Sequence, residues 1–164
     1  MKKTLDLHYR SENELAKSLS NLYPYTFMMD GYLIRSMEGM LQSIKTNDMN
    51  EKVKMWGMSG IQCWKYGQQF NNWKDTQILY DNFGKLVYRH SKEYDFLIQT
   101  AFDALFKNED FKRRLKESLP YNISHTMGKT DKNDSVLTKD EYIDNLERLR
   151  NQLRERRFFN LFKF

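Results

Sequence analysis

The dipeptide Asp30-Gly31 constrains the fold more than any other part of this chain. It separates two short apolar runs, Phe27-Met28-Met29 and Tyr32-Leu33-Ile34. Asp-Gly between apolar runs is typical of the two-residue turn of a β-hairpin, because both central residues of that turn have positive φ. The sequence therefore predicts a hairpin over 27–34, which leads the chain directly to Ser36.

Ser36 is expected to cap a helix that begins at Met37. Apolar residues recur on one face of this helix with the spacing i, i+3, i+4 and i+7: Met37, Met40, Leu41 and Ile44. Glu38, Gln42 and Lys45 follow a neighbouring face, so Glu38 lies in the first turn at the edge of the core. Acids are common in a first turn because the helix dipole favours them there, and spacing alone does not make Glu38 functional.

Caps, breaks and stop signals divide the rest of the chain into further helices and one more hairpin. The expected helices cover about 11–20, with Ser11 as the cap, 48–67, with a break at Gly57 and Gly60 and with Trp64 among its apolar positions, 91–107, 109–118 and 138–153. Residues 8–10 are expected to be extended. A second hairpin joins 76–80 to 85–88. The fold class is α+β, a mostly helical single domain with two small β-hairpins.

Length and hydropathy indicate the number of domains and the compartment in which the protein is expected. At 164 residues the chain has room for one domain with a substantial core, which we place over 1–157. Residues 158–164 form an aromatic tail, expected to lie against its own domain, with a partner or nucleic acid as alternatives. No run approaches the roughly 18 consecutive apolar residues of a membrane span. Asp6 precedes any apolar signal core, so we expect a cytoplasmic protein without membrane partners.

Charge and cysteine content limit the kinds of ligand. The net charge of +5 and the pI near 9.2 favour phosphate-bearing ligands, but they are below those of dedicated nucleic-acid binders. The single Cys63 excludes an internal disulfide and supplies no metal cluster. The chain has no P-loop, no dinucleotide fingerprint, no His-Glu-x-x-His and no Cys-x-x-Cys. We therefore expect no metal and no cofactor.

Carboxylates and aromatic residues remain as carriers of chemistry. Glu38, Asp131 and Asp134 are candidate acids, and Tyr23 and Trp73 are candidate stacking surfaces. Two carboxylates that flank a glycosidic bond suffice for its hydrolysis, because one activates water and the other stabilises an oxocarbenium-like transition state. An aromatic face can stack on the leaving base. The pattern by itself is compatible with hydrolysis and does not require it.

A series of motifs in fixed order resembles the NADAR family, also called YbiA-like. The first motifs are Leu19-Ser20-Asn21-Leu22-Tyr23-Pro24, Asp30-Gly31, Ser36-Met37-Glu38 and Gln42-x-x-Lys45. Later segments, including Trp73-Lys74-Asp75-Thr76-Gln77 and Ser124-His125-Thr126-Met127-Gly128-Lys129, are similar to a branch found in bacteria and phages. The resemblance spans about residues 8–150 and implies a YbiA-like fold. It also implies an N-glycosidase: studied members cleave ribose–nitrogen bonds in ribosylamino-pyrimidine phosphates of riboflavin synthesis or in ADP-ribosylated guanine of DNA.

The resemblance assigns roles to three residues. The essential Glu of the family corresponds to Glu38, its active-site Trp to Trp73 and its later Asp to Asp131. The chain departs from the better-known branch because no Trp-Gly pair follows Asp131, which leaves Asp134 as an alternative second carboxylate. Gly39 stands where the family usually has His.

These assignments define an expected site for a phosphorylated N-riboside or an ADP-ribosylated substrate, with nucleic acid as a further candidate partner. Glu38 would steady the positive charge at the anomeric carbon, Asp131 would act as general base or acid, and Trp73 would stack on the base or ribose. The expected binding residues are Asn21, Tyr23, Arg10, Lys45, Lys74, Lys129 and Asp134, with the basic ones as phosphate contacts. His125 is expected to be structural. The alternative functions are a non-hydrolytic sensor of ADP-ribose-like nucleotides and a nucleic-acid-binding module.

Overall fold

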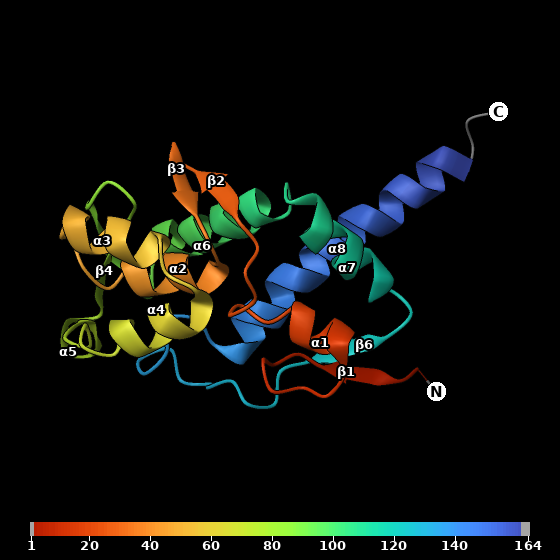
Figure 1. Ribbon diagram of the computed structural model, residues 1–164, viewed down its shortest axis with the longest axis horizontal. Coiled ribbons are helices and arrows are strands. Elements are labelled where there is room, and N and C mark those ends of the chain that lie inside the picture. Colours follow the sequence, from red (N-terminus) through yellow and green to blue (C-terminus); the bar gives the residue numbers. More distant parts are fainter. Residues whose placement is uncertain (1, 162–164) are drawn as a thin grey trace.

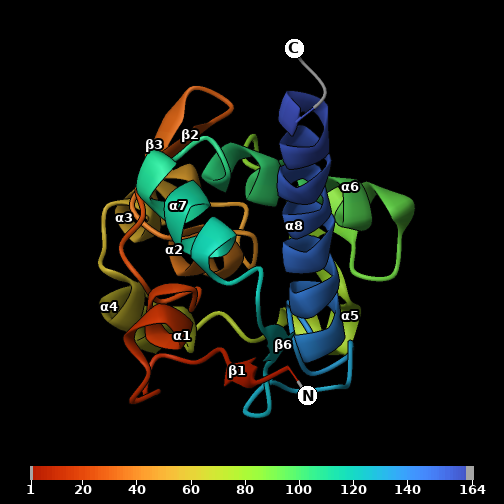
Figure 2. The same ribbon diagram turned by 90° about the vertical axis from the view of Figure 1, so that its right-hand side faces the viewer.

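Helix α8 (Lys139–Leu161) is the longest element, and its last turns project beyond the rest of the molecule (Figure 1). A computed structural model describes residues 2–161, with side chains up to residue 155. The other helices are α1 (Glu14–Ser18), α2 (Met37–Ser43), α3 (Met49–Trp56), α4 (Gly60–Gly67), α5 (Trp73–Thr76), α6 (Lys92–Leu105) and α7 (Glu109–Glu117). The strands are β1 (Thr4–Asp6), β2 (Phe27–Met29), β3 (Tyr32–Ile34), β4 (Ile78–Tyr80), β5 (Leu86–Tyr88) and β6 (Asn122–Ser124). In Figure 2, α7 lies beside α8 and α6 passes behind α8.

The β2–β3 hairpin and helix α2 confirm the expectation from the sequence. The two strands pair antiparallel around Asp30 and Gly31, whose φ values are 52° and 83°. Positive φ at both positions is what this two-residue turn requires. Ser36 then caps α2, where its Oγ accepts a hydrogen bond from the Gly39 N–H at 3.1 Å. Every residue of α2 is buried, so this helix lies within the core.

The second hairpin and the break between helices are also confirmed. Strands β4 and β5 pair antiparallel, and the side chain of Asn82 in their turn donates to Asp30 Oδ2 at 2.9 Å. The expected helix over 48–67 is divided at Gly57 into α3, capped by Asp48, and α4, capped by Ser59. The two hairpin turns thus support each other beside the helices.

The N-terminal region differs from the prediction. Strand β1 pairs parallel with β6, which adds a third two-stranded sheet that no local pattern indicated. Residues 8–10 form a turn rather than an extended segment, because the Ser11 N–H donates to the His8 carbonyl at 3.0 Å. Helix α1 is capped by Asn13, not by Ser11, since Asn13 Oδ1 accepts from the Ala16 N–H at 3.0 Å. The turn at residues 8–10 leaves residues 7–10 beside the segment that follows β6.

A buried ion pair holds the loop that precedes α8. No part of the Arg89 side chain is exposed, and its guanidinium donates to both Glu141 oxygens at 3.0 and 2.7 Å. Arg89 Nε also donates to the Ser135 carbonyl at 2.9 Å. Glu141 forms a capping box with Thr138 at the start predicted for this helix, because each side chain accepts a hydrogen bond from the backbone N–H of the other. The loop over 128–137 is therefore tied to β5 and to the first turn of α8.

The C-terminal part of α8 continues past the boundary expected at residue 157 and ends at Leu161. The side chains of residues 158–161, and all of residues 162–164, lie outside what the structure describes, so the docking of the tail stays a prediction. Over the described part of the chain, no helix combines the length and the apolar character needed to cross a membrane.

Candidate active site

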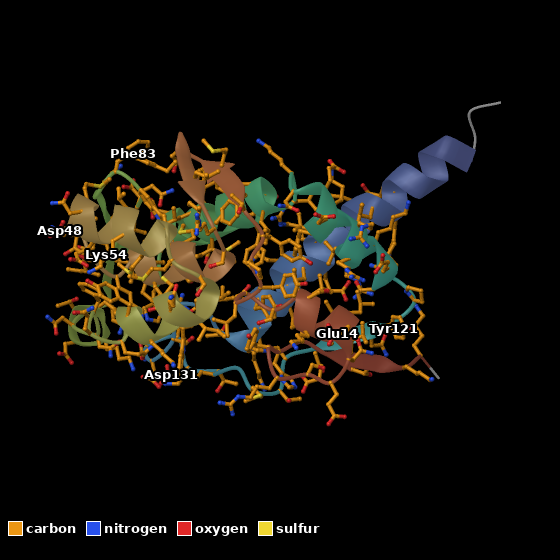
Figure 3. The ribbon with its side chains drawn as sticks, viewed as in Figure 1. Glu14, Asp48, Lys54, Phe83, Tyr121 and Asp131 are labelled. Atoms are coloured by element: carbon orange, nitrogen blue, oxygen red, sulfur yellow. The ribbon has the colours of Figure 1, made fainter. Side chains whose placement is uncertain are left out.

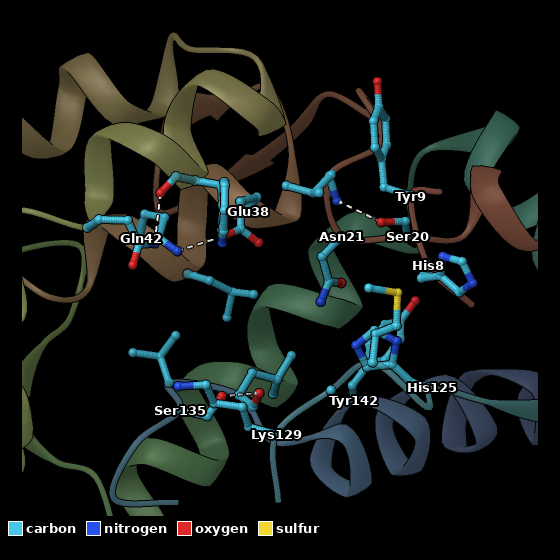
Figure 4. Close-up of a pocket in the computed structure, with 18 of the residues that line it drawn as sticks. His8, Tyr9, Ser20, Asn21, Glu38, Gln42, His125, Lys129, Ser135 and Tyr142 are labelled. Atoms are coloured by element: carbon cyan, nitrogen blue, oxygen red, sulfur yellow. Dashed lines mark hydrogen bonds between the residues drawn. The ribbon is translucent and has the colours of Figure 1, made fainter. Parts of the chain in front are cut away.

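A pocket of about 700 Å³ lies where segments from distant parts of the chain meet. Its walls come from α2, α4, α5, residues 7–10, residues 20–22, the loop over 125–137 and the first turn of α8. Figure 4 shows Glu38 and Gln42 on one side of the pocket, Lys129 and Ser135 across from them, and Asn21 pointing into the space between. The volume is in the range of pockets that enclose a small organic ligand.

The first wall contains a buried carboxylate, Glu38. Only 8% of this residue is exposed, and its Oε1 accepts a hydrogen bond from Gln42 Nε2 at 2.6 Å. The backbone N–H of Glu38 donates to the Asn21 carbonyl at 3.0 Å, which joins the Ser20–Leu22 segment to the start of α2. Burial raises the pKa of the Glu38 carboxyl, and the hydrogen bond from Gln42 and the charge of Lys45 oppose this shift only in part.

Lys45 is the cation whose charge opposes the raised pKa of Glu38. It follows the end of α2, lines the pocket, and its Nζ donates to the Gly67 carbonyl at 3.4 Å. Burial lowers the pKa of Lys45 to about 8, against the opposing effect of the Glu38 charge. Burial thus shifts the pKa values of Glu38 and Lys45 toward neutrality, while the charge of each group opposes the shift of the other.

Small residues bring helix α4 close to α2. A Cβ atom at Gly67 would lie 1.9 Å from Gln42 Oε1, and one at Gly60 would lie 2.2 Å from the Leu22 carbonyl oxygen. Gly60, Cys63 and Gly67 form the buried face of α4. Trp64 follows directly after this face, is 49% exposed and lines the pocket. Trp64 was counted among the apolar positions of the predicted helix. The spacing of the small residues Gly60, Cys63 and Gly67, which marks the buried face, was the signal that this interpretation missed.

The opposite wall contains a second carboxylate, Asp134, in very different surroundings. Its two oxygens accept hydrogen bonds from Lys129 Nζ and Lys74 Nζ, and its side chain is 43% exposed. These hydrogen bonds, from Lys129 and then Lys74, lower the pKa of Asp134 to about 2. Asp134 is therefore an ionised partner of two lysines at every physiological pH.

Asp131 and Tyr23, two of the residues predicted for the site, lie outside the lining of the pocket. Asp131 is exposed at the periphery of the molecule (Figure 3), where its Oδ1 accepts from the Asn133 N–H at 2.8 Å and closes a turn. Tyr23 packs against the ring of Tyr25 at 4.9 Å. Of the two candidate second carboxylates, Asp134 is the one that reaches the pocket.

The other predicted residues all line the pocket: Arg10, Asn21, Glu38, Lys45, Trp73, Lys74, Lys129 and Asp134. Trp73 is only 3% exposed, and its Nε1–H has no acceptor among the described residues. Trp73 is therefore both a core residue and a wall of the pocket. Within residues 2–161, no three His, Cys, Asp or Glu side chains come together in a way that could hold a metal ion.

His125, which was expected to be structural, also lines the pocket. Its Nδ1 lies 2.5 Å from the Leu7 carbonyl oxygen, so this nitrogen carries the proton, and its ring meets that of Tyr142 edge to face at 5.0 Å. Burial lowers the pKa of His125, against the hydrogen bond to Leu7. These contacts are those of a histidine that fixes the wall of the pocket.

Comparison with known proteins places these residues in a family. A family model described as Bacteriophage protein GP30.3 matches residues 14–151. The chain belongs to the bacteriophage GP30.3 family. The matched span of the GP30.3 domain includes both carboxylate walls of the pocket.

Two relatives of this GP30.3-family chain extend the comparison. An uncharacterized 17.1 kDa protein from the Gp30-rIII intergenic region of Enterobacteria phage T4 is 30% identical over 138 residues, which cover 83% of this chain and 90% of the relative. The NMR structure of the E. coli protein YbiA matches with a TM-score of 0.62 and 18% identity, over 96% of this chain and 89% of that one. The predicted membership in a YbiA-like family of bacteria and phages is confirmed, and so is the YbiA-like α+β fold.

Proposed function

We propose that this protein is an N-glycosidase that hydrolyses the ribose–nitrogen bond of a phosphorylated N-riboside or an ADP-ribosyl adduct. The observation that carries the proposal is Glu38, a buried carboxylate in a pocket wall whose hydrogen-bond partner is a neutral amide instead of a cation. A carboxylate in such a site stabilises positive charge strongly, because little solvent screens it. The family resemblance of the Ser36-Met37-Glu38 motif supports the same role.

In the proposed reaction, the bond between the anomeric carbon and the nitrogen breaks and its electrons remain on the nitrogen. Glu38 faces the oxocarbenium-like carbon that forms and stabilises its charge. Water adds to this carbon and loses a proton, while the leaving nitrogen gains one. A carboxylate whose pKa is raised by burial is a stronger base than an exposed one, so Glu38 is suited to take up the proton from water.

The remaining walls of the pocket suit the other parts of such a substrate. Trp64 offers an exposed ring for stacking on the base, a role that we assign to it in addition to the buried Trp73. Lys74, Lys129 and Arg10 supply positive charge for phosphate groups. Asp131, as a turn residue outside the pocket, has no part in the proposed reaction.

The proposal is tested by incubating the protein with ADP-ribosylated DNA, NAD-type nucleotides and a ribosylamino-pyrimidine phosphate, and following the released sugar by mass. We expect release from one of these substrates by the wild type and none by Glu38→Gln, which keeps the size of the side chain. Full activity of the variant would refute the role of Glu38. Tight binding of a substrate without any release would instead favour the non-hydrolytic sensor.

A further inference from the structure

Two lysines at the loop wall of the pocket share a single carboxylate. Lys74, from α5, and Lys129, from the loop before α8, each donate to a different oxygen of Asp134. All three residues line the pocket, and their side chains are 36%, 57% and 43% exposed. Two lysines and one carboxylate give the cluster a net charge of +1. The cluster also faces a space large enough for a ligand.

A neighbouring donor in α5 has no partner. Trp73 precedes Lys74, lines the same pocket and is 3% exposed, and no acceptor for its Nε1–H exists within the described part of the chain. An indole nitrogen can only donate, so the missing group is an acceptor. Buried polar groups are normally satisfied. A ligand for this wall must therefore bring acceptor oxygens and negative charge, as a phosphate or diphosphate group does.

We infer that Lys74 and Lys129 form a phosphate subsite which the Asp134 carboxylate occupies when no ligand is bound, and that a phosphate or diphosphate group displaces this carboxylate. The inference rests on the proposed function, because it places the phosphorylated end of the substrate. Asp134 is then a stand-in for the phosphate rather than a second catalytic acid. A phosphate group with up to two charges would balance the two lysines better than one carboxylate does.

The backbone on both sides of Asp134 is anchored independently of its side chain. The Asn133 carbonyl accepts from Gln77 Nε2 at 3.1 Å, and the Ser135 carbonyl accepts from the buried Arg89 at 2.9 Å. The Asp134 carboxylate itself contacts only the ends of two flexible lysines among the residues described. Rotation of its side chain can therefore clear the subsite without unfolding the loop.

The test is calorimetric titration of the full chain with inorganic pyrophosphate at constant salt. We expect Asp134→Asn to bind pyrophosphate about tenfold more tightly, because two partly exposed ion pairs no longer have to break. Lys74→Gln and Lys129→Gln should each weaken binding. Asp131→Asn removes the same charge from the same loop outside the pocket, and its affinity should equal that of the wild type.

Unchanged or weaker binding by Asp134→Asn would overturn the inference, because Asp134 would then position the lysines instead of occupying their site. Equal tightening by Asp131→Asn would overturn it too, since the effect would be one of overall charge. Asp134→Ser gives a second version of the test if the asparagine variant folds poorly. Pyrophosphate binding needs no turnover, so failure of the proposed N-glycosidase activity and failure of this subsite are separate results.

Discussion

The two carboxylates of the pocket, Glu38 and Asp134, show how differently one chemical group behaves on opposite walls. Glu38 is 8% exposed, and this burial raises its pKa. Its hydrogen-bond partner is the neutral amide of Gln42. The Asp134 side chain is 43% exposed and is held by Lys129 and Lys74, which lower its pKa to about 2.

Because their surroundings differ, the two acids suit different roles. A carboxylate that remains ionised between two lysines cannot donate a proton near neutral pH, so Asp134 is excluded as a general acid. The charge of a buried carboxylate is little screened by solvent, so it acts strongly on a cationic transition state. This difference supports the proposed division of roles, in which Glu38 carries the chemistry and the wall of Asp134 binds anions.

The largest expected effect comes from breaking the support of the Asp134 wall. Arg89→Met leaves the partly buried Glu141 with only Lys132, 3.3 Å away, as a cation, and it leaves the Ser135 carbonyl without its donor. Removing one partner of a buried ion pair costs about 3–5 kcal/mol, and we expect a loss of this size in chemical denaturation. Arg113→Met, which removes an exposed arginine that also contacts two carboxylates, should change stability far less. Equal losses would show that Arg89 does not anchor the loop.

A smaller change should disturb the Glu38 wall alone. In Gly67→Ala the new Cβ would lie 1.9 Å from Oε1, 2.6 Å from Cδ and 2.8 Å from Cγ of the buried Gln42 side chain, which must therefore move at some cost in stability. Glu38 would then lose its hydrogen bond, and we expect turnover to fall roughly 10–100-fold. Pyrophosphate affinity, which depends on the opposite wall, should remain unchanged. A variant with normal turnover would separate Gln42 from the function of Glu38.

These two predictions rest on features that the sequence reveals unequally. The Asp30-Gly31 turn and the caps Ser36 and Thr138 are local signals, so the hairpin and the starts of α2 and α8 could be predicted. The pairing of β1 with β6 could not, because three-residue strands far apart in the chain carry no matching pattern.

The site was predictable to a similar degree. The helical register placed Glu38 at the edge of the core, and the family motif implied a place in the site; Glu38 does line the pocket. The choice between Asp131 and Asp134 depended on Lys74, a contact 60 positions away that no local pattern encodes. Trp64 was missed because its neighbours at small-residue spacing, rather than its own apolarity, determine which way it faces.

A third prediction tests binding on the Glu38 wall without altering its carboxylate. Trp64→Ala removes a ring that is 49% exposed, so we expect little change in stability. If the ring stacks on the substrate base, KM should rise about tenfold while kcat stays nearly constant. Steady-state kinetics decide this, and an unchanged KM would remove Trp64 from the site.

The smallest effect is a shift in the pH dependence of turnover, which accompanies the loss of rate expected whenever Glu38 loses its hydrogen bond. The hydrogen bond from Gln42 favours the ionised form of Glu38, so its loss in Gln42→Leu should raise the pKa of Glu38 further. Because the ionised form is the active one, the acidic limb of the rate profile should move to higher pH. In the Trp64→Ala variant, the acidic limb of the rate profile should lie at the same pH as in the wild type. A shift to lower pH in Gln42→Leu would contradict the assigned role of Glu38.

The most direct test of the division between the two walls is Glu38→Gln measured for turnover and for pyrophosphate affinity in the same preparation. If this division holds, Glu38→Gln lowers release of the sugar by about 10³-fold or more and leaves the pyrophosphate Kd unchanged. Retained turnover, or a parallel loss of pyrophosphate binding, would contradict it.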